Sequence, residues 1–196
     1  YIFDDFTKKQ LDTFTRVAAE LEAGLEYKVI KHILNSAGIE RFTDYQMDMV
    51  RLGIGLYGVS ASGQKGLRNI STLKTTILQI QNVPAGDSIG YSRMSYVKRD
   101  SRIAIIPIGY ADGLDRKLGC GRAYCLVNGR RAPYVGNICM DVCMIDVTDI
   151  DCREGDTAII FGDDLPVTVL SDAVGTIPYE ILTGVSARVK RVYYQD

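Results

Sequence analysis

The feature that most constrains the fold is a series of short β-branched runs, separated by turn residues, that fills the chain from residue 72 onward. Runs this short and this closely spaced are typical of an antiparallel sheet or barrel. Asn128-Gly129 lies between two of them, and this dipeptide favours the type I′ turn of a β-hairpin. Ser171–Leu182 is the one helix that we expect among them. The sequence therefore predicts a complete β domain over residues 67–196. The runs are Thr72–Val83, Arg102–Ile108, Ala123–Val127, Arg131–Val135, Val142–Val147, Thr157–Phe161 and Val185–Tyr193.

The first 25 residues have a helical pattern instead. Between Phe6 and Leu25 the apolar residues recur with the period of an α-helix, so one face of the segment is apolar. Thr7 followed by Gln10 resembles a capping box, and Gly24 stands near the expected end. We predict an amphipathic helix here.

The next part of the chain alternates between apolar and polar segments. Two apolar runs, Lys28–Leu34 and Met49–Tyr57, are predicted strands, and the polar patch Glu40–Asp48 between them is helix-like. This order is typical of a parallel α/β fold. We assign residues 1–58 to the last strands and helix of an incomplete α/β barrel and residues 59–66, which are small and polar, to a linker. Because patterned sequence begins almost at Tyr1, we expect a piece of a longer protein.

Composition excludes several classes of function. Lys and Arg number 23 against 24 Asp and Glu, and no basic stripe is present, so nucleic acid is not an expected partner. No apolar run approaches the ~20 residues of a membrane-spanning helix. The five cysteines lack metal-ligand spacing and His32 is the only histidine, so we expect reduced, mostly buried thiols, a cytoplasmic location and no metal site.

Two strand ends carry candidate binding residues. Ser36 follows the first predicted strand and has the chemistry to bind a phosphate; the alternative is a Ser that caps the next helix. Arg51 ends the second strand before two glycines and would place a permanent cation against a ring or an anion; the alternative is a surface Arg. His32 occupies a similar position on the neighbouring strand, where it can bond Arg51 or be a structural residue.

The β domain contributes three loop-like clusters. Tyr91 and Tyr110 each lie beside small residues, and a tyrosine hydroxyl can act as a general acid or base. The alternative for each is an amphipathic tyrosine with an apolar body and a wet tip. The third cluster runs from Gly136 to Asp141, and its spacing alone would place Met140 in the core.

Six segments together resemble bacterial alanine racemases, and they cover nearly the whole chain in that family's order, as its C-terminal half. They are His32-Ile-Leu-Asn-Ser-Ala-Gly, Val50-Arg-Leu-Gly-Ile-Gly-Leu-Tyr-Gly58, Gly90-Tyr91, Ile108-Gly-Tyr-Ala-Asp-Gly113, Ile138-Cys-Met-Asp141 and Pro178-Tyr-Glu180. The resemblance implies the end of a (β/α)8 barrel that binds pyridoxal 5′-phosphate, followed by the family's β domain.

It also implies roles for particular residues. Ser36, Gly53, Ile54 and Tyr179 would hold the cofactor phosphate. Arg51 would face the pyridine nitrogen, and His32 would orient Arg51. Because Arg does not give up its proton, the ring would stay a weak electron sink and Cα would be reprotonated quickly.

Inversion at Cα needs a base on each face of the substrate. The resemblance implies that Tyr91 is one base and the Schiff-base lysine the other. Tyr110, Cys139 and Asp141 would line the substrate entrance, and the Met140 backbone would contact the alanine carboxylate. The active unit would be a head-to-tail homodimer with composite sites.

Two departures from the family pattern are visible. The sequence has no Lys-x-Asn-x-Tyr-Gly segment, so we predict that the isolated chain does not racemise alanine, although the full-length protein would do so for cell-wall synthesis. Asn137 stands where the family often has an Arg. The alternatives are another barrel-type enzyme of the same cofactor, such as a decarboxylase, or a non-catalytic dimerisation module of a multidomain cell-wall protein, with a Mur-type ligase as a fusion partner.

Overall fold

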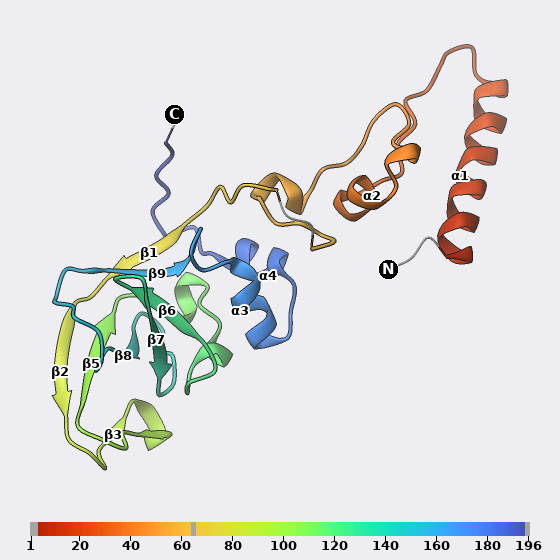
Figure 1. Cartoon of the computed structure of the whole chain (residues 1–196). Helices are drawn as coiled ribbons and strands as arrows, with labels where there is room; N and C mark the ends of the chain where they lie inside the picture. The colour runs from red at the N-terminus through yellow and green to blue at the C-terminus, as the bar shows by residue number, and fades with distance from the viewer. Residues whose placement is uncertain (1–3, 64–65, 195–196) are drawn as a thin grey trace. The chain divides into compact units, whose positions relative to one another are not determined.

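The computed structural model describes residues 4–63 and 66–194 (Figure 1). The chain divides into two compact units, Tyr1–Arg68 and Asn69–Asp196, each held together by its own contacts. Residues 64 and 65 of the expected linker lie outside the described residues. Within the described ranges, no helix has both the length and the apolar character needed to span a membrane.

The first unit begins with helix α1 (Asp5–Gly24). Its N-cap is Asp4, whose carboxylate accepts a hydrogen bond from the Thr7 backbone N–H at 2.8 Å. The predicted capping-box start at Thr7 is therefore wrong by three residues, because an Asp side chain satisfies the first-turn donors better than Thr does. The helix ends at Gly24, as expected.

The two segments predicted as barrel strands, residues 28–34 and 49–57, are not strands. Helix α2 (Ser36–Arg41) and the short 3-10 helices η1 (Thr43–Tyr45) and η2 (Ile54–Tyr57) are the regular elements here. Two isolated backbone bonds join the segments, from Asp48 N to Lys31 O and from Arg51 N to Leu34 O. A parallel strand is stabilised by a regular series of backbone hydrogen bonds to its neighbours, and these two isolated bonds do not make such a series.

Glu40 on α2 holds the start of the expected linker. Its carboxylate accepts hydrogen bonds from the Ser60 hydroxyl at 2.7 Å, from the backbone N–H of Ala61 and Ser62 at 3.1 Å, and from the Ser62 hydroxyl. Burial alone would raise the pKa of Glu40, but the serine hydrogen bonds outweigh it and lower the pKa. Residues 60–62 are thus fixed to α2.

The second unit is built on one antiparallel sheet of seven strands in the order β1-β9-β6-β7-β8-β5-β2. Strands β1 and β2 stand at opposite ends of this order, yet only two residues separate them in the chain. Ile77 N donates to Asp156 O on the β9 side and Leu78 N donates to Ile105 O on the β5 side. The sheet therefore curls until its two end strands meet, as Figure 1 shows. Its strands are β1 (Leu73–Thr76), β2 (Gln79–Val83), β5 (Ser101–Ile106), β6 (Tyr124–Val127), β7 (Arg130–Val135), β8 (Cys143–Asp146) and β9 (Thr157–Phe161).

The centre of this sheet agrees closely with the sequence prediction. Asn128 and Gly129 have φ angles of 49° and 73°, as a type I′ turn requires, and they join β6 to β7. Tyr134 on β7 is fully buried, and its hydroxyl has no hydrogen-bond partner within the described residues. Cys125 and Cys143 are buried as well. Cys152 is buried too, so three of the five thiols are buried as expected, Cys139 is partly buried and Cys120 is exposed.

Four parts of the second unit differ from the prediction. The run Thr72–Val83 is two strands rather than one. The expected helix 171–182 is two helices, α3 (Val167–Val174) and α4 (Pro178–Gly184), which lie together at one end of the sheet (Figure 1). Gly175 in the left-handed conformation ends the first helix and Pro178 begins the second.

Residues 185–193 form no strand. A short hairpin that the sequence did not indicate, β3 (Ser88–Ile89) with β4 (Ser95–Tyr96), projects from the sheet.

Candidate functional site

In the first unit, Ser36 meets the glycine-rich turn that follows Arg51. The Ser36 hydroxyl accepts a hydrogen bond from Gly53 N at 2.8 Å and lies 3.5 Å from Gly55 N. Ser36 and Ile54 are both buried. Asn35 is the residue that caps α2, by accepting from Gly38 N at 3.0 Å. The structure thus gives Ser36 a different task from the capping role weighed above.

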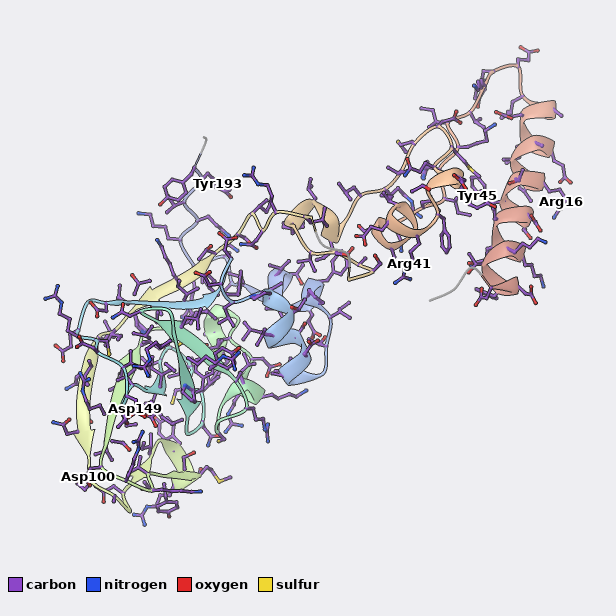
Figure 2. All side chains as sticks on the ribbon, in the orientation of Figure 1. Arg16, Arg41, Tyr45, Asp100, Asp149 and Tyr193 are labelled. Atoms are coloured by element: carbon purple, nitrogen blue, oxygen red, sulfur yellow. The ribbon has the colours of Figure 1, made fainter. Side chains whose placement is uncertain are left out.

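Arg51 lies beside the same turn. Its guanidinium donates to the Ile33 carbonyl at 2.9 Å rather than to His32. The His32 Nδ1 atom is buried and has no hydrogen-bond partner within the described residues. Arg51 also lines a hollow of this unit together with Asn35, Arg41 and Tyr45, of which the last two are labelled in Figure 2. Two guanidinium groups thus line one concave surface, which suits an anionic or electron-rich ligand.

In the second unit, Tyr91 lies at the tip of the β3–β4 hairpin, in η3 (Tyr91–Arg93). The hairpin is anchored by buried Ile89, and the Tyr91 side chain is 73% exposed. The Asn137 side-chain amide donates to the Tyr91 carbonyl at 3.1 Å. Gly136 N, one residue earlier, donates to the Ser95 hydroxyl at 3.0 Å. Two bonds therefore hold the tip against residues 136–137.

Tyr110 is positioned by residues 139 and 140. It begins η4 (Tyr110–Asp112), and its N–H donates to Cys139 O at 3.0 Å, while Ala111 N donates to Met140 O at 3.0 Å. A Cβ atom on Gly109 would lie 2.3 Å from both carbonyl oxygens, so only glycine permits this approach.

Met140 is 54% exposed, so the expectation of a core methionine is wrong. The residue precedes β8 in a turn, where the alternation of a strand does not apply. Its backbone N–H has no acceptor within the described residues. Cys139 is partly buried and lines a hollow that Tyr91 also lines.

Asp141 does not face this hollow as a free carboxylate. Arg188 donates to it at 2.6 Å and to Asp112 at 2.7 Å, so one guanidinium bridges both loops. The remaining Asp112 oxygen accepts from Gly109 N at 2.8 Å. Burial alone would raise the pKa of Asp112, but the bonds from Arg188 and Gly109 lower it.

Tyr179 is the second residue of α4, directly after Pro178, and is 43% exposed. Its carbonyl accepts from the Thr183 hydroxyl at 2.8 Å. Over residues 4–63 and 66–194, no three His, Cys, Asp or Glu side chains are grouped to hold a metal ion.

The structure therefore gathers the candidate residues into two groups, one in each unit. Ser36, Gly53 and Ile54 meet in the first unit, and the loops of Tyr91, Tyr110 and Met140 meet in the second. Sequence reasoning missed the contacts made by Gly109 and Arg188 and assigned no role to Asn137 as a hairpin anchor. The Gly109-Tyr110 motif itself was a signal for the first of these, whereas Arg188 lies outside every motif.

Two family models match the chain, the alanine racemase C-terminal domain over residues 70–193 and the alanine racemase N-terminal domain over residues 2–61. The chain belongs to the alanine racemase family. Alanine racemase 1 of Caldanaerobacter subterraneus subsp. tengcongensis is 40% identical over 98% of this chain, and alanine racemase of Mycobacterium tuberculosis is 38% identical over 97%. The chain spans about half the length of these curated relatives, 52% in each case.

Solved racemase structures have the same fold as this chain. Alanine racemase from Bartonella henselae, with covalently bound pyridoxal phosphate, matches 97% of this chain and 53% of its own, with 36% identity and a TM-score of 0.87. Alanine racemase from Streptomyces lavendulae matches 98% of this chain and 53% of its own, with 32% identity and a TM-score of 0.92. The fold is therefore that of the end of the racemase barrel followed by the β domain, even though the barrel segments form no strands here.

Proposed function

We propose that this chain is part of a pyridoxal phosphate-dependent alanine racemase that interconverts L- and D-alanine for cell-wall synthesis. The observation that carries the proposal is the meeting of the Tyr91, Tyr110 and Met140 loops in the second unit. A tyrosine hydroxyl supplies a base, and an unpaired backbone N–H at Met140 supplies a donor for a carboxylate. The named relatives support the choice of alanine.

The first unit fits the phosphate end of the cofactor. The N–H groups of Gly53 and Gly55 point at the Ser36 hydroxyl oxygen, so these three groups lie together, and hydroxyl and backbone N–H groups are the donors that phosphate esters bind. We propose Ser36, Gly53 and Ile54 of this unit as phosphate-binding residues, and Tyr179, which belongs to α4 of the second unit, as a fourth. Pyridoxal phosphate, when bound, supplies the electron-withdrawing ring that makes the Cα proton of an amino acid acidic.

We propose that Arg51 contacts the pyridine ring and that His32 orients Arg51. A guanidinium group offers only hydrogen-bond donors, so Arg51 can donate a hydrogen bond to the ring nitrogen. The unpartnered Nδ1 of His32 supports a role beside this group, because a buried imidazole nitrogen without a partner is costly.

Tyr91 is proposed as the base on one face of the substrate. Its exposure of 73% and that of Met140 suit residues that complete the site of a second copy, and we propose a head-to-tail homodimer. Tyr110 and Cys139 would line the entrance to that site. Five free thiols support a reducing, cytoplasmic location.

The domain limits stay a proposal: residues 1–58 as barrel end, 59–66 as linker and 67–196 as β domain. The two racemase models together occupy residues 2–61 and 70–193, which leaves no region of this chain for a ligase domain. We also propose that residues 1–196 alone are inactive, because the second base lies in a Lys-x-Asn-x-Tyr-Gly setting that this sequence lacks. Formation of D-alanine by the purified chain with cofactor and L-alanine would disprove this.

The experiment that tests the function is Tyr91→Phe in the full-length protein, with Tyr193→Phe as a matched exposed tyrosine (Figure 2). Loss of one general base should lower kcat by about 10²-fold or more, while Tyr193→Phe has no effect. In D2O the Tyr91→Phe variant should still exchange the Cα hydrogen of one enantiomer but no longer invert it. Unchanged racemisation, with cofactor absorbance and dimer intact in every variant, would make Tyr91 structural and favour an assembly module. A substrate panel on the same protein separates a racemase from a decarboxylase.

A further inference from the structure

The structure assigns Arg188 as a positioning residue that holds the proposed substrate-carboxylate site in shape, by bridging Asp112 and Asp141. This inference rests on the proposed function for its catalytic consequence, although the bridge itself does not. Arg188 lies 76 residues after Asp112 and 47 after Asp141, and it joins both carboxylates through different nitrogens, Nε and Nη2. The planar guanidinium allows this double bridge, whereas a lysine ammonium would reach one carboxylate well at most.

The Arg188 bridge joins the same two loops as the backbone bonds that fix Met140. Asp112 ends the Tyr110 turn and Asp141 follows Met140 directly, so the two carboxylates belong to the two loops joined by the Tyr110–Cys139 and Ala111–Met140 backbone bonds. The Met140 N–H can point toward a ligand only while these loops keep their register. Arg188 thus reinforces two backbone bonds of ordinary strength with two charge-assisted ones.

Removing the guanidinium would do more than delete two bonds. The Asp112 side chain is only 13% exposed, so it would be left as a poorly solvated carboxylate. Asp141 would remain close to it with the same charge, and the two would repel each other. Because one carboxylate belongs to the Tyr110 turn and the other to the loop of Met140, their repulsion would weaken the two backbone bonds that join these loops.

The segment that carries Arg188 is also fixed to the Tyr110 turn by contacts that do not involve the Arg188 side chain. Ser186 N donates to Asp112 O at 3.0 Å, and a Cβ on Gly113 would lie 2.1 Å from Gly184 O. Arg191 donates to the carbonyls of Val185, Ser186 and Val189 and touches neither loop. Arg188 therefore extends from a segment whose backbone is already held, which is what a positioning side chain needs.

The test compares Arg188→Ala with Arg99→Ala in the full-length protein loaded with cofactor. Arg99 is the matched control, an exposed arginine of the same unit that forms an ion pair with Asp149, which Figure 2 labels. Loss of two charge-assisted bonds should raise KM for alanine about tenfold or more with kcat changed less than about threefold, since the carboxylate contact acts in binding. Arg188→Lys should fall between, and adding Asp141→Asn to Arg188→Ala should recover part of the affinity.

Hydrogen exchange of the same variants separates this inference from the proposed function. Exchange at Tyr110 and Ala111 should accelerate in Arg188→Ala and not in Arg99→Ala. Unchanged exchange refutes the bridge. Faster exchange with unchanged KM makes Arg188 structural and refutes the positioning role. If Tyr91→Phe leaves racemisation intact, the proposed function fails while the exchange result still stands. Should Arg188→Ala fail to fold, Arg188→Lys and Asp141→Asn decide by the same two measurements.

Discussion

Replacing Gly109 by Ala tests whether the Tyr110 turn depends on close backbone contact. Gly109 has φ −147° and ψ −167°, an extended conformation that alanine adopts freely, so the substitution introduces no backbone strain. The added Cβ would lie 2.3 Å from the carbonyl oxygens of both Cys139 and Met140, whereas real Cβ contacts stay beyond 3.0 Å. The two loops must therefore separate by roughly 0.7 Å.

The magnitude follows from the bonds that this separation breaks. The Tyr110–Cys139 and Ala111–Met140 hydrogen bonds are each 3.0 Å long, so an extra 0.7 Å removes both. At about 1 kcal/mol net for each bond, and with some strain left in the turn, the free energy of unfolding should fall by about 2–3 kcal/mol. The alanine KM of the full-length protein should rise as well, because Met140 loses its fixed orientation.

The assay is urea unfolding of the chain. Unfolding is monitored by hydrogen exchange in peptides from β6 and β7, so that the transition measured is that of the second unit. The transition midpoint should fall with little change in its denaturant slope. Gly184→Ala is the matched control, since its Cβ would have no neighbour within 4 Å, and it should stay within about 0.5 kcal/mol of the parent chain. A Gly109→Ala chain as stable as the Gly184→Ala chain would refute the reasoning.

Three further predictions concern the core and the Tyr91 hairpin. Burial raises the pKa of Cys125 from 9.0 to about 12. Above pH 9 the folded state therefore keeps a proton that the unfolded state loses. For this thiol, the free energy of unfolding should fall there by about 1.4 kcal/mol per pH unit. Urea titrations should show a shallower fall in Cys125→Ala and no change of slope in Cys120→Ala; equal slopes would contradict the assignment. Tyr134→Phe removes a buried hydroxyl without a partner and should raise the free energy of unfolding by about 1 kcal/mol in the same assay, and a loss of stability would reveal a hidden partner. Asn137→Asp replaces the amide that holds the Tyr91 carbonyl, so in the full-length protein kcat should fall about tenfold, with no additional fall in a Tyr91→Phe background.

The fold of the second unit was predictable where the signals are local. Asn128-Gly129 specifies a turn by its own φ preferences, and the strands on either side follow from it. The break between α3 and α4 was also signalled locally, by Gly175 and Pro178, although the sequence prediction placed a single helix there. The sequence predicted an antiparallel sheet or a barrel, but it did not indicate how the sheet curls, because the curl depends on one run, 72–83, that pairs at its two ends with strands far apart in the sequence.

The first unit shows a different limit of sequence reasoning. The apolar runs at 28–34 and 49–57 have the composition of buried parallel strands, and the chain as a whole matches racemase structures. Apolar composition indicates that a segment is buried, whereas a strand also needs a regular series of hydrogen bonds to a neighbouring strand. Residues 28–34 and 49–57 therefore belong to a chain that matches racemase structures, but they do not form hydrogen-bonded strands.

The candidate site was predictable as a set of motifs but not as a set of contacts. The resemblance to alanine racemases implied that Asp141 lines the substrate entrance, and a sequence motif does not say where a carboxylate points in a turn. Its partner, Arg188, lies 47 residues away in a segment expected to be a strand. A charged residue next to a ligand-binding backbone group has two possible tasks, to meet the ligand or to hold the backbone that does. The short ion pair with Arg188 favours the second task for Asp141, because the guanidinium offsets a negative charge that would otherwise repel the carboxylate of an amino acid.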